Sequence, residues 1–196
     1  MVCPLCNVEL LDGFCPQCKV SESYVQIFPK MVQFIETRES GIALEVHPHS
    51  AELFGSTVLS KGEGVWQYVA INLIREGMVT KERLCDDYMD LDHLFFPDDI
   101  FDLFIMANSS TLRKVFDYEQ ALSEINRVLK PNGVVYMKVD YSNIIPFSTR
   151  HRADDKKNIW NFGVDIFETM ENIFRGIDQD EETGIVTAYP KITWDY

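Results

Sequence analysis

Four cysteines near the start of the chain have the spacing of a metal site. Cys3 and Cys6 form one Cys-x-x-Cys pair, and Cys15 and Cys18 form a second pair after eight intervening residues. A Cys-x-x-Cys turn directs two sulfur atoms at one ion, so two such turns supply the four ligands of a tetrahedral site. The Asp-Gly pair at residues 12–13 predicts the chain reversal that brings the turns together. The pattern therefore predicts a four-cysteine metal centre, with two local disulfides as the alternative.

The ligand set narrows the choice of ion and its role. Short ribbons of this kind usually carry zinc, although a rubredoxin-like iron site uses the same four thiolates. Four sulfurs leave no open coordination position, so the ion is expected to be structural and not catalytic. Residues 1–20 resemble the short zinc ribbons that serve as caps or docking modules. That resemblance implies an unidentified protein or nucleic-acid partner docked by the ribbon.

Composition limits the classes of function that the chain can have. The chain has 196 residues and a formal net charge of -13, and its basic residues do not gather into a long run. This argues against broad nucleic-acid binding through phosphate contacts. No apolar run has the length of a membrane span, no signal peptide is visible, and the fifth cysteine, Cys85, stands alone in an apolar segment. We therefore expect a cytoplasmic protein with no membrane partner.

The rest of the chain alternates strand patterns with helix patterns. Strands are expected at 41–46, 83–88, 101–107, 134–139, 176–180 and 184–188, and helices at about 25–35, 118–129 and 158–174. We expect residues 21–40 to form a linker and a short helix, and residues 41–196 to form one α/β domain. Its predicted core is a Rossmann-like, mostly parallel sheet closed by a C-terminal antiparallel hairpin.

One region admits two interpretations. The preferred interpretation places the second strand at 56–60 and a helix at about 64–76, because apolar residues between 65 and 74 share one helical face. The alternative places the strand at 65–71. The choice matters because the carboxyl end of the second strand is a ligand-binding position in open parallel sheets.

Two segments carry a family resemblance. The stretch at 89–103 reads MDLDHLFFPDDIFDL, and the stretch at 121–133 reads ALSEINRVLKPNG. They are similar to the third-to-fourth strand region, and to the helix and turn before the fifth strand, of class I S-adenosylmethionine-dependent methyltransferases. With the closing hairpin, the resemblance covers about residues 41–190. It implies that the cofactor binds at the carboxyl ends of the first strands.

The resemblance also implies candidate cofactor-binding residues. Glu45 would orient the amino group of the cofactor, Asp90 would contact adenine, and Glu63 would substitute for the acidic residue that holds the ribose hydroxyls. His47 and His49 stand where the family has glycines. Each has a structural alternative: a surface carboxylate for Glu45, a helix or turn cap for Asp90, and imidazoles that fill a vacated pocket, or bind a metal or move protons, for the two histidines.

Two functions of different classes follow. The first is a methyltransferase with an unknown acceptor and no catalytic residue that can be named. The second is an inactive methyltransferase-like scaffold that binds a protein or nucleic acid through the ribbon. The replaced glycines favour the scaffold, whereas the intact region around Asp90 favours the enzyme. Residues 140–143, after the fifth strand, either face a substrate or form an ordinary loop.

Overall fold

A seven-stranded sheet organises the residues described by the computed structural model, which are 1–48, 54–60, 64–73, 87–151 and 159–191. Its strand order is β3-β2-β1-β4-β5-β9-β8. The strands are β1 (Ser40–Val46), β2 (Val65–Leu73), β3 (Asp87–Met89), β4 (Phe101–Met106), β5 (Leu129–Lys138), β8 (Gly176–Asp180) and β9 (Ile185–Tyr189). β1 to β5 pair in parallel, whereas β9 runs antiparallel to β5 and β8. The mostly parallel sheet with a C-terminal hairpin is therefore confirmed.

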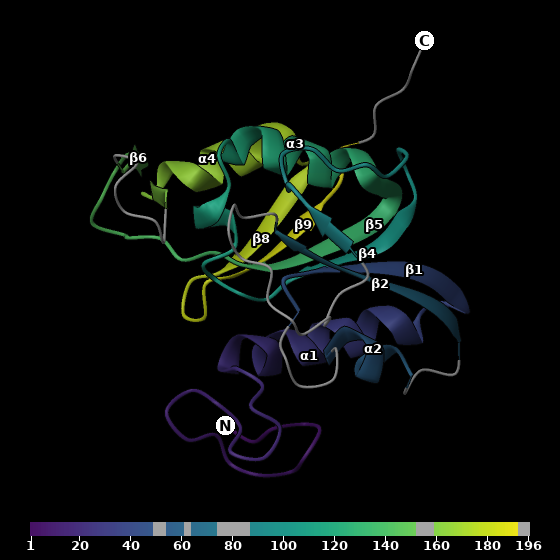
Figure 1. Cartoon of the computed structure of the whole chain (residues 1–196). Helices are drawn as coiled ribbons and strands as arrows, with labels where there is room; N and C mark the ends of the chain where they lie inside the picture. Colours follow the sequence, from purple (N-terminus) through teal and green to yellow (C-terminus); the bar gives the residue numbers. More distant parts are fainter. Residues whose placement is uncertain (49–53, 61–63, 74–86, 152–158, 192–196) are drawn as a thin grey trace.

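Helices cover both faces of this sheet (Figure 1). α1 (Glu22–Glu36) and α2 (Phe54–Leu59) lie on one face, and α3 (Tyr118–Val128) and α4 (Asp165–Ile173) lie on the other. A short 3-10 helix, η1 (Leu112–Lys114), and a strand pair, β6 (Thr149–Arg150) with β7 (Trp160–Asn161), complete the domain. Because both faces are covered, all six residues of β4 are buried.

The N-terminal helix follows the ribbon without a gap. Ser21 is the N-cap residue of α1, and the helix continues for 15 residues with its buried side chains turned toward the sheet. The helix predicted within 21–40 is therefore present. The division of the chain at residues 20 and 40 stays a prediction.

The preferred interpretation of residues 56–76 is wrong. Residues 54–59 form the helix α2, and residues 65–73 form the strand β2. The reason is pairing: β2 pairs with β1 along seven consecutive positions, from Val65 opposite Ser40 to Ile71 opposite Val46. A run rich in β-branched and aromatic residues is suited to such a half-buried position between two strands. The alternative strand at 65–71 is confirmed.

The helix predicted at 158–174 begins later, at Asp165, because residues 160–161 form β7. The Asp165 carboxylate accepts hydrogen bonds from the N–H and the hydroxyl of Ser148, at 2.8 and 2.6 Å. These bonds fasten the start of α4 to the loop after β5. A Cβ on the preceding Gly163 would lie 2.5 Å from the Ile145 carbonyl oxygen, so the turn before the helix requires glycine.

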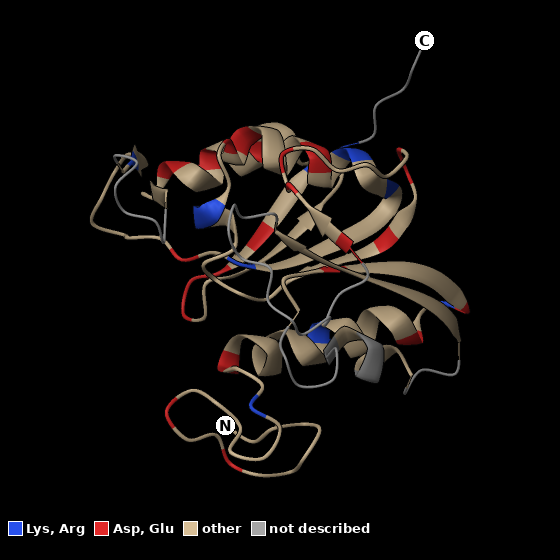
Figure 2. Cartoon of the chain, in the orientation of Figure 1, with Lys and Arg blue, Asp and Glu red and all other residues tan. Residues whose placement is uncertain are grey.

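Surface charge follows the composition. Figure 2 shows carboxylates along α3 and α4 and at the β8–β9 turn, with lysines and arginines scattered between elements. Among the described residues, no helix is long and apolar enough to cross a membrane.

Candidate functional site

The four cysteines of the ribbon converge on one point. Their sulfur atoms all lie within 4.8 Å of one another, and the Sγ atoms of Cys3 and Cys18 are 3.6 Å apart. Tetrahedral zinc, with Zn–S bonds of about 2.3 Å, holds its sulfurs about 3.8 Å apart. All four are free thiols, of which Cys3 and Cys15 are buried. The donor set therefore fits a tetrahedral ion, and the alternative of two local disulfides is not seen.

The two cysteine turns share one backbone geometry. In the first turn, the N–H of Asn7 donates to the Cys3 carbonyl at 2.9 Å, and Asn7 has φ 56°. In the second turn, the N–H of Lys19 donates to the Cys15 carbonyl at 2.9 Å, and Lys19 has φ 61°. The Asp-Gly pair at 12–13 takes φ values of 50° and 79°, which makes the predicted reversal. The ribbon is therefore two equivalent turns joined by a tight hairpin.

Hydrogen bonding prepares one of the sulfurs for an ion. The backbone N–H of Cys18 donates to Cys15 Sγ at 3.5 Å, and this bond is the main cause that lowers the pKa of the Cys15 thiol to about 7. Burial raises the pKa of Cys18 to about 12. A metal must displace the thiol protons to bind, and Cys15 loses its proton more readily than Cys18.

Glu45 lies at the carboxyl end of β1 and is fully buried. Its Oε2 accepts hydrogen bonds from the Tyr68 hydroxyl at 2.6 Å and from the Gly55 N–H at 2.9 Å. A Cβ on Gly55 would lie 2.5 Å from this oxygen, so only glycine allows so close an approach. The alternative of a surface carboxylate is therefore wrong. Glu45 instead fixes the start of α2 against the sheet.

Burial raises the pKa of Glu45, and hydrogen bonds from Tyr68, Tyr24 and Gly55 offset part of that rise. A raised pKa means that the folded protein keeps a proton that the unfolded chain has released. We therefore expect the contribution of Glu45 to stability to fall as pH rises above about 4.3, the ordinary value for glutamate. Denaturant unfolding between pH 4.5 and 8 measures the free energy of unfolding of the wild type and of Glu45→Gln. As pH rises, the value for the wild type should fall relative to the value for Glu45→Gln. Parallel curves would contradict this, and Glu36→Gln, at an exposed position, is the control.

His47 occupies the backbone conformation of a glycine. Its φ is 58°, in the left-handed region, which costs a non-glycine residue about 1–2 kcal/mol. Its N–H donates to the Ile71 carbonyl at 2.8 Å, and its carbonyl accepts from the Tyr24 hydroxyl at 3.3 Å. His47 therefore takes a backbone conformation that is typical of glycine, with a side chain added. The second candidate histidine, His49, lies outside the described residues.

Asp90 lies just after β3 and is exposed. Partial desolvation of its carboxyl, and to a smaller extent repulsion from Asp92, raises its pKa, and the His93 N–H donates to the Asp90 carbonyl at 3.1 Å. Glu63 lies outside the described residues, and in sequence it precedes β2, which begins at Val65. The corrected strand therefore removes the argument that placed Glu63 at the end of the second strand.

The corrected position of the second strand identifies a candidate residue that the sequence analysis missed. Asn72 is the polar side chain near the carboxyl end of β2, opposite Tyr88 of β3, and its Oδ1 accepts from the Leu73 N–H at 3.0 Å. It stands next to the end of the strand, where the family places the acidic residue for the ribose. The β-branched and aromatic run at 65–71 was the signal that could have located it.

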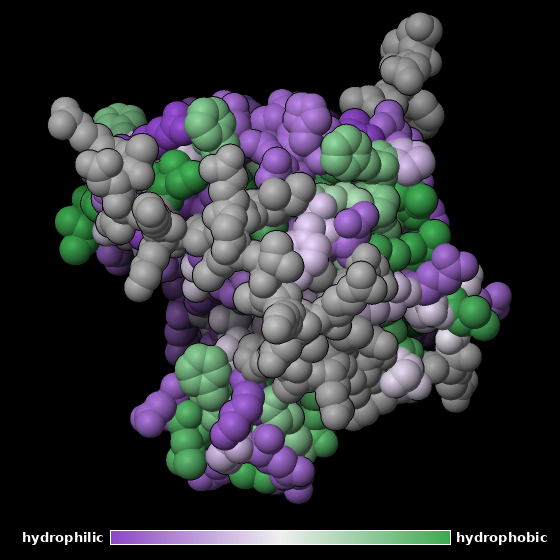
Figure 3. All heavy atoms as spheres, in the orientation of Figure 1, coloured by the Kyte–Doolittle hydropathy of each residue, from purple (hydrophilic) through white to green (hydrophobic). Residues whose placement is uncertain are grey.

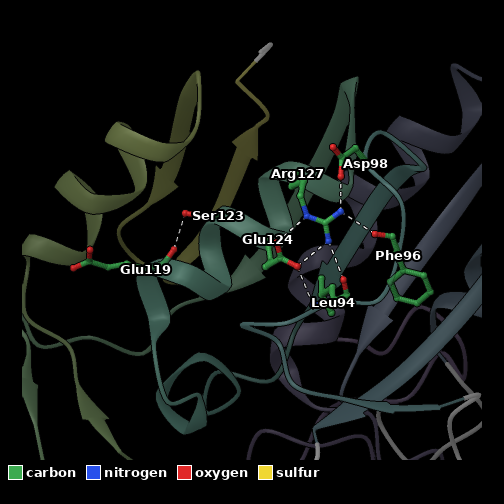
Figure 4. A network of polar contacts seen from close by, with 7 residues as sticks. All are labelled: Leu94, Phe96, Asp98, Glu119, Ser123, Glu124 and Arg127. Carbon is green, nitrogen blue, oxygen red and sulfur yellow. Dashed lines mark hydrogen bonds and ion pairs between the residues drawn. The ribbon is translucent and has the colours of Figure 1, made fainter. Parts of the chain in front are cut away.

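Arg127 of α3 holds the segment that follows Asp90 (Figure 4). Its guanidinium donates to both carboxylate oxygens of Glu124, at 2.7 and 2.8 Å, and to the carbonyls of Leu94 and Phe96, at 2.9 and 2.8 Å. A further bond reaches the Asp98 carboxylate at 2.5 Å. Three of these five donor contacts thus tie residues 94–98 to the helix, and the two to Glu124 hold the guanidinium in place.

Two cavities lie at the carboxyl edge of the sheet. The larger, of about 430 Å³, lies between the ribbon, the start of α1 and the ends of β1 and β4. The smaller, of about 260 Å³, is lined by Asp140, Tyr141 and Asn143, together with the β8–β9 turn. Residues 140–143 therefore border this smaller cavity. The sequence predicted that they either face a substrate or form an ordinary loop.

Comparisons with known proteins agree with this architecture. A model of the family described as "Methyltransferase domain" matches residues 55–137. The ubiquinone/menaquinone biosynthesis C-methyltransferase UbiE of Cupriavidus pinatubonensis is 39% identical over 72 residues, which are 37% of this chain and 27% of that protein. The chain thus matches about a quarter of the length of that curated relative.

Two solved structures share the fold at low identity. The 1,6-didemethyltoxoflavin-N1-methyltransferase of Burkholderia thailandensis has a TM-score of 0.53 at 12% identity, over 84% of this chain and 78% of that one. An S-adenosylmethionine-dependent methyltransferase of Mesorhizobium loti has a TM-score of 0.54 at 14% identity, over 85% and 97%. The resemblance seen in the sequence is confirmed.

Proposed function

We propose that this methyltransferase-like chain binds S-adenosylmethionine at the carboxyl edge of β1, β2 and β3 and transfers its methyl group to an acceptor. The observation that carries the proposal is the placement of Glu45, Asn72 and Asp90 at the ends of three adjacent parallel strands. Ligands of open parallel sheets bind outside the carboxyl ends of their strands. The acceptor remains unnamed, because no described residue selects one.

Each of the three residues has a proposed task. Asn72 would hydrogen-bond the ribose hydroxyls as a neutral substitute for a carboxylate. Asp90 would accept a hydrogen bond from the adenine amino group. Glu45 would act through the buried network with Tyr68 and Gly55, which shapes the loop that faces the methionine part of the cofactor.

The chemistry requires positioning more than acid or base groups. The bound cofactor supplies a methyl group on a cationic sulfur. Held by Asn72 and Asp90, it would supply that methyl group to a lone pair of the acceptor and would leave as S-adenosylhomocysteine, and any proton of the acceptor would go to solvent. Holding the two reactants in line accounts for a large part of such a rate enhancement. The protein's contribution is thus the geometry of the strand ends.

The four cysteines would hold a structural zinc ion. Zinc is favoured over iron because four thiolates in a short ribbon are its usual ligand set. With no open position, the ion takes no part in methyl transfer. The exposed apolar side chains of Met1, Val2 and Leu11 on the ribbon would be the surface for a partner protein or nucleic acid.

Calorimetry with S-adenosylhomocysteine, the product form of the cofactor, tests the cofactor site. We expect micromolar binding by the wild type. Asp90→Ala should weaken it about tenfold through the loss of one hydrogen bond, and Asn72→Asp should strengthen it about tenfold, because a carboxylate accepts stronger hydrogen bonds from the ribose. Asn172→Asp, on the exposed surface of α4, is the matched control.

An absence of heat at millimolar ligand, in the wild type and in Asn72→Asp alike, would sink the enzyme proposal. That result would support the second candidate, an inactive scaffold that docks a partner through the ribbon. Two observations favour this alternative: a histidine fills the left-handed glycine position, and a neutral asparagine stands at the ribose position.

A further inference from the structure

We propose that the ion at the four cysteines controls ligand binding in the 430 Å³ cavity through a relay of hydrogen bonds. The relay runs from the ribbon hairpin at residues 13–14, through the first turn of α1, to the backbone of His47. The inference rests on the proposed function for the identity of the ligand. It goes beyond that function because it makes the ribbon part of the binding site and couples the two sites.

The first step joins the ribbon to the helix. The carbonyl of Gly13 accepts a hydrogen bond from the Glu22 N–H at 2.8 Å, and Phe14 forms a β-bridge with Ser21. Phe14 is the direct neighbour of the ligand Cys15. An ion that fixes Cys15 therefore also fixes the hairpin that receives the start of α1.

The second step joins the helix to the sheet. Tyr24, in the first turn of α1, is 1% exposed, and its hydroxyl donates to the His47 carbonyl at 3.3 Å. The same hydroxyl helps to lower the pKa of Glu45, against the larger effect of burial. A single side chain thus touches the backbone of the glycine-like loop and the buried carboxylate beneath it.

The third step concerns His47 itself. A histidine in the left-handed region is held there by its surroundings, because the backbone alone disfavours it. Two described contacts fix its backbone, namely the carbonyl bond from Tyr24 and the N–H bond to Ile71. Loss of the Tyr24 contact should therefore let His47 leave its present backbone conformation.

The cavity shows why this matters for a ligand. Its walls come from the ribbon hairpin, the first turn of α1, the end of β1 and the segment after β4. The described lining includes Phe14, Glu22, Tyr24, His47 and Asn108. Figure 3 shows hydrophobic and hydrophilic residues mixed on the surface of the ribbon, and Phe14, which lines the cavity, is 50% exposed.

Charge defines the class of occupant. The described lining holds the Glu22 carboxylate and no lysine or arginine. Such a wall attracts a cationic group, such as the ammonium that S-adenosylmethionine and S-adenosylhomocysteine share. A segment of this length has too little core to hold its shape without the ion. Metal removal should therefore disorder the ribbon segment that forms one wall of the cavity. Because linked binding equilibria are reciprocal, a ligand in the cavity should also raise the affinity of the cysteines for the ion.

Hydrogen exchange on the full chain tests the relay without depending on any ligand. We expect the amides of residues 45–47 to exchange at least tenfold faster after zinc is stripped with a chelator, while β9 keeps its protection. Tyr24→Phe should speed the same amides in zinc-loaded protein, because it removes the hydroxyl and keeps the ring. Tyr189→Phe, at an exposed position, is the control. If zinc removal unfolds the whole chain, the test rests on Tyr24→Phe in zinc-loaded protein. Unchanged exchange of the amides of residues 45–47 in that variant would contradict the relay.

Binding of S-adenosylhomocysteine supplies the second readout. Phe14→Ala should weaken it about tenfold, and Gln17→Ala, at an exposed ribbon position that is not among the described lining residues, should leave it unchanged. Equal effects of the two substitutions would refute a role for the ribbon as a wall. If zinc-loaded wild type binds no S-adenosylhomocysteine, the proposed function fails, whereas the exchange experiment still confirms or refutes the coupling.

Discussion

Replacing Cys15 by serine is expected to remove the bound ion and to unfold the ribbon. Cys15 is fully buried, its sulfur lies within 4.8 Å of the other three, and a hydroxyl is a poor zinc ligand. Binding of structural zinc by comparable peptides contributes about 10–16 kcal/mol at neutral pH, so the loss of one ligand should be the largest effect of any single substitution in this chain. Metal analysis by mass spectrometry should find one zinc per chain in the wild type and less than about a fifth of that in Cys15→Ser.

The matched control is Cys85→Ser, which changes the one cysteine outside the ribbon pattern and should keep the ion. One iron per chain, with the colour of a ferric thiolate site, would replace zinc in the assignment and keep the four ligands. A wild-type protein that holds no metal after purification without chelators would contradict the metal centre itself.

Replacing Arg127 by alanine should lower the free energy of unfolding by about 2–3 kcal/mol. All five of its donor contacts would be lost, and the Glu124 carboxylate, whose side chain is 13% exposed, would keep its charge without its partner. The expected loss is smaller than the roughly 3–5 kcal/mol of a fully buried pair, because the Arg127 side chain is 29% exposed.

Denaturant unfolding measures this effect. Arg127→Lys should recover less than half of the loss, because an ammonium cannot span both oxygens of Glu124 and two carbonyls at once. Arg175→Ala, at an exposed position, should change stability by less than about 0.5 kcal/mol. A loss for Arg127→Ala as small as that of the control would show that the network is only a surface feature.

Much of the fold was predictable because local pattern and tertiary position agree. The apolar run at 103–106 of β4 is typical of a strand covered on both faces, and the apolar stripe of α3 faces the sheet as expected. β2 was predicted as a helix because its apolar residues fit both periods. Its pairing with β1 and β3 is a long-range contact that a local pattern does not contain.

In the candidate site too, features that depend on local sequence were predictable, and features that depend on long-range contacts were not. The cysteine spacing lies within one short segment, so the metal centre could be inferred directly. Asn72 was missed because its role depends on where β2 ends. The contact between the ribbon and the cavity was missed because it depends on how Tyr24 packs against His47, 23 residues away in sequence.

The pair of equivalent turns in the ribbon has a thermodynamic consequence. An ion held by both turns is a crosslink between residues 3 and 18 that forms and breaks with the supply of free metal. By mass action, each tenfold rise in free ion above the dissociation constant adds about 1.4 kcal/mol to the stability of the segment. A disulfide at the same place would add a fixed amount. The rigidity of the N-terminal segment is therefore a variable set by its surroundings as well as by its sequence.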